Sequence, residues 1–234
     1  MAQVENELVF SMNHLSLATY AKLGGIPWLL ASQQTVAHEL VIGLGSHSVA
    51  TSRIGSQQRF VGITIVFSSD GSYLLSDRTA VVPFEEYADA LYDTLKRSIT
   101  TVRKQDNWRS TDKVRLVFHM FKPPKDTEAE AVKRTVDALG LDNVTFAFMH
   151  VAPNHPYLIF DNTQDGIGYR DPKKGVLGPA RGLHLKLGDY ESLVVFSGAS
   201  ELKQASDGMP RPCLFKITSP FDIYRYDLSR TSGI

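Results

Sequence analysis

The chain has 234 residues, 43% of them hydrophobic and 21% charged, which is enough to bury a core in one large domain or two small ones. Its 25 Lys and Arg residues balance 25 Asp and Glu residues, so a global positive field is excluded and any phosphate contact must come from a local cluster. The single cysteine, Cys213, excludes an internal disulfide framework, and the absence of a long apolar run or signal-like start leads us to expect a cytoplasmic protein without a membrane partner.

Hydrophobic periodicity and turn residues predict a mixed α/β fold. Near-helical spacing that begins at residue 12 predicts a helix to about Leu23, where Gly24 and Gly25 break the pattern, and a short apolar segment follows. A second helix opens at Pro83. The predicted strands and the third helix are, in chain order, strands 40–50, 59–68, 73–82 and 114–121, helix 127–139 and strand 144–151.

Residues 40–151 therefore have the order β-β-β-α-β-α-β, an antiparallel hairpin sheet followed by crossover helices, which is the ribonuclease H-like topology. We expect an α/β fold with this mixed sheet as its core and with additional C-terminal strands. These further strands are predicted over 157–160, 183–187, 192–197 and 213–217, with a long loop over 161–182 and helix character in 220–234. Neither a repeat nor a clear linker divides the chain, so one domain is expected.

Two segments near the start carry the most specific motifs: residues 20–28 have the sequence YAKLGGIPW, and residues 39–46 have the sequence ELVIGLGS. In this order and at this distance they resemble the opening of the PIWI domain of Argonaute proteins, in particular the nuclease-inactive prokaryotic branch. Later segments resemble further landmarks of that domain in the same order. These are HVAPNHP at 150–156, GLHL at 182–185 and GMPRP at 208–212.

The resemblance implies two regions. Residues 1–38 would be a connecting segment that leads into the PIWI domain, and residues 39–234 would be the ribonuclease H-like PIWI domain, lacking its C-terminal end. A MID domain, in the same polypeptide or in another chain, would supply most of the pocket for the 5′ end of the guide.

The resemblance also locates the acids that slicing relatives use. Their two-metal chemistry needs several convergent carboxylates, and the first and third of these fall on Gly45 and Met120, while the second falls near Glu86 and the fourth lies beyond Ile234. We therefore expect no nuclease activity and no catalytic or metal site. Asp70 and the neighbouring Asp77 could substitute only if a second carboxylate lay beside them, and the sequence identifies none.

Binding of a strand needs fewer groups than its cleavage, because cationic side chains hold phosphates directly. The resemblance assigns Lys22 to the guide 5′-phosphate and His155, Arg211 and Arg230 to the guide backbone. Arg181 belongs to the basic long loop, which would either become ordered on nucleic acid or a partner, or remain a mobile solvated loop. The alternatives are a solvated helix-end lysine, a capping histidine and a surface arginine.

The function implied is guide-dependent recognition of a target strand, RNA or DNA, in prokaryotic defence together with a separate effector protein. No cofactor is certain, although one divalent cation could lie at the guide 5′-phosphate. Two alternatives stay open: an active metal-dependent nuclease of the ribonuclease H class, and a PIWI-shaped interaction subunit without nucleic acid. Net neutrality favours the second alternative, as does Ala18, where slicing relatives carry another lysine.

Overall fold

The computed structural model describes residues 2–26, 29, 31, 36–50, 57–77, 81–124, 126–140, 143–152, 154–169 and 172–218. Within these ranges the strands form a nine-stranded mixed sheet ordered β3-β2-β1-β5-β6-β9-β8-β7, with β4 paired to β2. The helices are α1 (Ala2–Lys22), α2 (Tyr87–Gln105) and α3 (Asp126–Ala138). The strands are β1 (His38–Ala50), β2 (Gln57–Ser68), β3 (Tyr73–Asp77), β4 (Val81–Pro83), β5 (Val114–Met120), β6 (Val144–Ala152), β7 (His184–Lys186), β8 (Glu191–Val194) and β9 (Cys213–Thr218). Short 3₁₀ turns cover Phe84–Glu86, Ala199–Glu201 and Ala205–Asp207.

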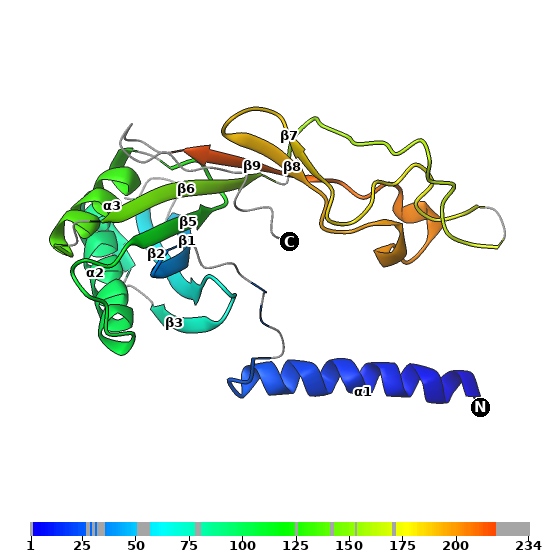
Figure 1. Cartoon of the computed structure of the whole chain (residues 1–234), viewed down its shortest axis with the longest axis horizontal. Helices are drawn as coiled ribbons and strands as arrows, with labels where there is room; N and C mark the ends of the chain where they lie inside the picture. Colours follow the sequence, from blue (N-terminus) through cyan, green and yellow to red (C-terminus); the bar gives the residue numbers. More distant parts are fainter. Residues whose placement is uncertain are drawn as a thin grey trace.

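The central strands have the predicted ribonuclease H-like arrangement. Strands β1, β5 and β6 are parallel neighbours, and β2 and β3 extend the sheet from β1 in antiparallel pairs. Helices α2 and α3 form the crossovers that connect the parallel strands, and Figure 1 shows them lying together on one side of the sheet. The predicted order β-β-β-α-β-α-β and the additional C-terminal strands are confirmed.

The main hydrophobic core lies between this sheet and its two helices. Alternate side chains of β5, namely those of Leu116, Phe118 and Met120, point into it because successive strand residues face opposite sides. A smaller apolar cluster lies on the other face of the same strands and contains Val117 and Met149. The sheet therefore has a helix-covered face and a second face on which residues from β5, β6 and β9 come together.

The structure differs from the sequence-based prediction in three elements. Helix α1 begins at Ala2, about three turns before the predicted start, and the strand predicted over 73–82 is two strands, β3 and β4. The strand predicted over 157–160 is wrong: these residues have no ladder, because β9 already occupies the edge of β6 and β8 pairs with β9. A locally strand-like run cannot form a strand without a free edge to pair with.

The long loop of residues 161–182 is held by its own hydrogen bonds in the ranges described. Ile167 and Lys174 exchange both backbone hydrogen bonds, at 2.8 and 3.0 Å, and the Lys174 ammonium donates to the carbonyl oxygens of Ser200 and Leu202, at 3.2 and 2.9 Å. A Cβ at Gly175 would come 2.3 Å from the Cβ of Ala199, so only glycine allows this close approach. These contacts tie the described residues of the loop to one another and to the segment 200–202.

Candidate nucleic-acid interface and the ribonuclease-like pocket

An apolar pocket of about 780 Å³ lies against the helix-free face of the sheet, at the carboxyl ends of the parallel strands. Its floor includes Gly43 and Gly45 of β1 and His119 of β5, and its far wall includes Phe196 and Phe215. Ligands of open α/β sheets bind at such strand ends. The pocket therefore occupies the place where a ribonuclease H-like enzyme would keep its acids.

Gly45 lies at an irregularity of the sheet. The β1–β2 register shifts between Leu44 and Ser46, so one residue of β1 faces two of β2, as in a β-bulge. A Cβ added at Gly45 would meet no heavy atom within 4 Å, and a Cβ at Gly43 would meet only a backbone oxygen at 3.9 Å. The two glycines leave an open floor instead of presenting side chains.

His119, and not Met120, is the β5 residue that shares this face with the glycines. The parallel registers place His119 beside Gly43 of β1 and beside Met149 of β6, whereas the Met120 side chain lies in the core below the helices. Burial lowers the pKa of His119, so its imidazole is neutral at neutral pH. The alternation of apolar residues in β5 could have indicated which face of the sheet His119 occupies. Only the tertiary structure shows that this face lines the pocket.

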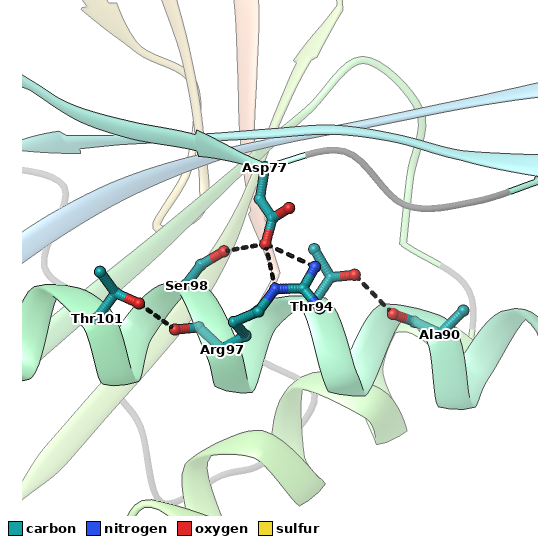
Figure 2. Close-up of polar contacts among 6 residues, drawn as sticks. All are labelled: Asp77, Ala90, Thr94, Arg97, Ser98 and Thr101. Atoms are coloured by element: carbon teal, nitrogen blue, oxygen red, sulfur yellow. Dashed lines mark hydrogen bonds and ion pairs between the residues drawn. The ribbon is translucent and has the colours of Figure 1, made fainter.

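The acids named as possible substitutes are engaged elsewhere. Asp77, at the end of β3, forms an ion pair with Arg97 of α2 at 2.7 Å and accepts a hydrogen bond from Ser98 at 3.4 Å, as Figure 2 shows. Asp70 accepts from the Ser68 hydroxyl and from the Ser72 N–H, and these bonds hold the pKa of Asp70 below its usual value. Asp70 thus closes the predicted turn, while Asp77 faces α2 and not solvent.

Glu86 lies at the N-terminus of α2, where its side chain is exposed and makes no capping hydrogen bond. No group of three or more His, Cys, Asp or Glu side chains that could hold a metal ion occurs among the residues that the structure describes. In that part of the chain, therefore, the residue types at the first and third acid positions do not fit a two-metal centre.

Two of the predicted binding residues are brought together. The Nε2–H of His155 donates to the carbonyl oxygen of Pro212 at 2.7 Å, and its Nδ1 accepts the N–H of Tyr157 at 3.2 Å. His155 thereby fixes the segment beside Arg211, whose exposed side chain lies between the buried Pro210 and Pro212. In this arrangement both ring nitrogens of His155 are used by the backbone, and Arg211 presents an exposed cation.

Arg181 also lines the pocket. Its side chain is 68% exposed, and its guanidinium lies 3.4 Å from the carboxylate of Glu201. The backbone N–H of Gly198 also binds Glu201, at 2.6 Å, and is the main cause that lowers the pKa of Glu201. Because the Glu201 carboxylate keeps its hydrogen bond from the Gly198 N–H, Arg181 can move away from Glu201 without leaving that carboxylate unpaired.

Lys22 is exposed in the last turn of α1, directly before the Gly24 turn, which has a φ of +88°. Figure 1 shows α1 lying apart from the sheet, and Lys22 is not among the described residues that line the pocket. Arg230 lies outside the described residues. Among the helices described, none is long and apolar enough to cross a membrane.

No protein-family model matches the chain, but two curated proteins are similar to it. It is 35% identical over 215 residues to Protein argonaute from Cereibacter sphaeroides, a match that covers 90% of this chain and 28% of that protein. It is 27% identical over 158 residues to a Piwi protein from Archaeoglobus fulgidus, covering 65% of this chain and 36% of that protein. The chain thus spans about a third or less of the length of these relatives.

Solved Argonaute structures have the same fold at low sequence identity. A. aeolicus Argonaute aligns over 92% of this chain and 26% of its own, with a TM-score of 0.58 and 14% identity. Marinitoga piezophila Argonaute, solved in complex with a 5′-OH guide RNA and a target DNA, aligns over 83% of this chain and 25% of its own, with a TM-score of 0.53 and 13% identity.

Proposed function

Because this chain is homologous to Argonaute and Piwi proteins and has their PIWI-like, ribonuclease H-like fold, we propose that it binds a guide strand for recognition of a target strand and does not cut that target. The observation that carries the binding part is the similarity to an Argonaute protein over 90% of the chain. The M. piezophila Argonaute structure, which holds a 5′-OH guide RNA and a target DNA, supports nucleic acid as the partner class.

The non-cleaving part is supported by the residue types in the pocket. Gly43, Gly45 and His119 stand on the face where carboxylates would have to converge, and hard divalent ions need oxygen ligands in number. The proposed binding of guide and target requires no catalytic metal ion. A cation at the guide 5′-phosphate, a MID-containing partner, an effector protein and a role in prokaryotic defence extend this proposal and rest on the family relationship.

Exposed cations would make the phosphate contacts. Arg211 is preordered between two prolines, and Lys22 is the last residue of α1, directly before the Gly24 turn. Arginine in a fixed orientation suits a phosphate because its planar fork can donate two parallel hydrogen bonds. A chain of zero net charge then binds through a few defined positions and not through a diffuse field.

The test is the affinity of the 234-residue chain for labelled single strands over a series of salt concentrations. Binding should weaken linearly in a plot of log affinity against log salt, because each neutralised phosphate releases counterions. Arg211→Ala should weaken binding about tenfold and reduce the salt slope by about one. Lys22→Ala should do so for 5′-phosphorylated strands and leave 5′-hydroxyl strands unchanged.

Lys104→Ala is the matched control, because Lys104 is an exposed cation in the last turn of α2, on the helix-covered side. It should bind as the unchanged chain does. Salt-independent binding, or equal losses in all three variants, would contradict the guide hypothesis and favour the interaction subunit. Incubation of guide, target and Mg²⁺ or Mn²⁺ should give no cleavage product, and a product lost on chelation would favour the nuclease alternative.

A further inference from the structure

We propose that the apolar pocket receives a single unpaired nucleotide of the bound strand, with the base lying on the glycine floor and its phosphate at Arg181. This inference rests on the proposed function and deepens it by naming what the pocket recognises. The volume of about 780 Å³ lies in the range of small-molecule sites, which are mostly apolar with a few placed polar groups.

The floor suits a flat ring. Gly43 and Gly45 place bare backbone at the bottom of the pocket, and space above Gly45 is open for at least 4 Å from a Cβ position. Backbone without side chains allows a planar group to approach closely. The neutral His119 imidazole beside Gly43 can donate or accept one hydrogen bond with a base edge.

The far wall is aromatic. The rings of Phe196 and Phe215 lie 5.8 Å apart between centroids, at 60° to each other, and Phe196 is 47% exposed. At the end of β5 the side chain of Phe121, another lining residue, is 78% exposed. Exposed aromatic side chains serve as stacking platforms for bases of single strands, whatever the sequence of the strand.

The positive charge of Arg181 favours an anionic ligand in this pocket. Arg181 is the cation there, and among the described lining residues there is neither Asp nor Glu. The Arg181–Glu201 pair is long and solvent-exposed, and such pairs contribute little, so a phosphate can replace Glu201 as the partner of Arg181. A purely apolar ligand would leave Arg181 paired only with Glu201, whereas a nucleotide could contact both the apolar lining and this arginine.

The experiment uses the 234-residue chain and single strands that carry 2-aminopurine, a fluorescent adenine analogue, at one position per strand. The fluorescence should be quenched on binding at one position, since a base enclosed by aromatic side chains is quenched. Phe196→Ala should relieve this quenching and weaken binding about tenfold. An abasic strand at the same position should bind equally well to Phe196→Ala and to the unchanged chain.

Two further variants test whether the quenching arises in the pocket. Gly45→Leu fills the open floor and should abolish the position-specific quenching, with thermal unfolding recorded to confirm that it is folded. Tyr169→Ala removes a fully exposed aromatic ring that does not line the pocket, and it should change nothing. In a second measurement, AMP alone replaces the strand, and it should bind far more weakly than the strand does.

The outcomes separate this inference from the proposed function. Strand binding that is normal, with no position-specific quenching and no effect of Phe196→Ala, overturns the pocket assignment and leaves guide binding intact. Phe196-dependent binding of AMP without binding of strands overturns the assignment to a strand and contradicts the proposed function as well. Strand binding with Phe196-dependent quenching at every position equally shows a non-specific aromatic surface and also overturns the assignment.

Discussion

Gly45 of β1 stands where the family resemblance puts the first acid of slicing relatives, and none of the described residues that line the pocket around it is Asp or Glu. The neighbouring residues on the same face are Gly43, His119 and Met149, which carry no carboxylate. Restoring one acid would leave the remaining ligand positions without oxygen donors.

Gly45→Asp should therefore fold and remain unable to cleave. The new Cβ meets nothing within 4 Å, and removing glycine from a strand gains about 0.5–1 kcal/mol, which offsets part of the cost of placing a carboxylate in an apolar pocket. We expect the free energy of unfolding to change by less than about 1 kcal/mol. Urea denaturation and a cleavage assay with Mg²⁺ or Mn²⁺ measure the two expectations, and metal-dependent product from this single variant would show that other acids converge here.

The carboxyl group of Asp112 should make the stability of the fold depend on pH. It accepts the N–H of Arg109 at 2.8 Å and lies 3.1 Å from the His38 ring nitrogen, and these hydrogen bonds, Arg109 first, lower the pKa of Asp112 from the model-peptide value of 3.8. A carboxyl group whose pKa is lower in the folded state adds stability above its unfolded pKa and loses it as the pH falls through the folded pKa.

Asp112→Asn should consequently be less stable than the unchanged chain by a constant amount above about pH 5, and the difference should shrink as the pH falls below about 4. Denaturant unfolding between pH 7 and pH 3 measures it. A difference that grows as the pH falls would contradict the assignment.

At the scale of elements, helix α2 is the main support for the sheet from its covered side. Its buried residues recur every three to four positions, and Asp77 anchors it to the end of β3 through Arg97 (Figure 2). The ion pair is partly exposed and contributes at most about 1 kcal/mol. Apolar burial along α2 therefore contributes more to holding the helix in place than the Asp77–Arg97 ion pair does.

Leu95→Ala should show this directly. Leu95 is fully buried in the core, and truncation of a buried leucine costs about 2–5 kcal/mol through lost transfer energy and the cavity left behind. The denaturation midpoint should fall with an unchanged slope. Lys104→Ala on the same helix is the exposed control and should stay within about 0.5 kcal/mol of the unchanged chain. Equal effects of the two changes would contradict the packing assigned to α2.

At the scale of the whole molecule, the described parts differ in how deeply their side chains are buried. Strands β5 and β6 lie in the middle of the sheet with buried residues on both faces, whereas nearly every described side chain of α1 is exposed, and Figure 1 shows this helix apart from the rest. Opening free energies follow local burial.

Amide hydrogen exchange should separate these regions in the 234-residue chain. Amides of β5 and β6 should exchange slowest, with protection approaching that of global unfolding, and those of α1 should exchange within the fastest class. Mass-spectrometric exchange after peptic digestion resolves the two regions. Slow exchange in α1 would show that this helix is covered in solution, either by a second copy or by another part of the chain.

The order of the central elements could be predicted from the sequence because it is a local property. Alternation in 114–121 and helical periodicity in 127–139 follow from which side chains must be buried, and Asp70–Gly71 marks a turn by its own conformational preference. The motifs near Gly24 and Gly45 indicated the family for the same reason, since they lie in short continuous segments.

The composition of the pocket was decided by the tertiary structure alone. His119 and Phe196 are far apart in the chain and line one pocket only because the sheet places β9 and β8 next to the parallel strands, and the role of His155 beside Arg211 depends on a contact over 57 positions. The run at 157–160 did not extend the sheet from β6 because β9 pairs with β6 there. Local sequence fixes which conformation a segment prefers, but pairing and pocket formation depend on which distant segments compete for the same edge.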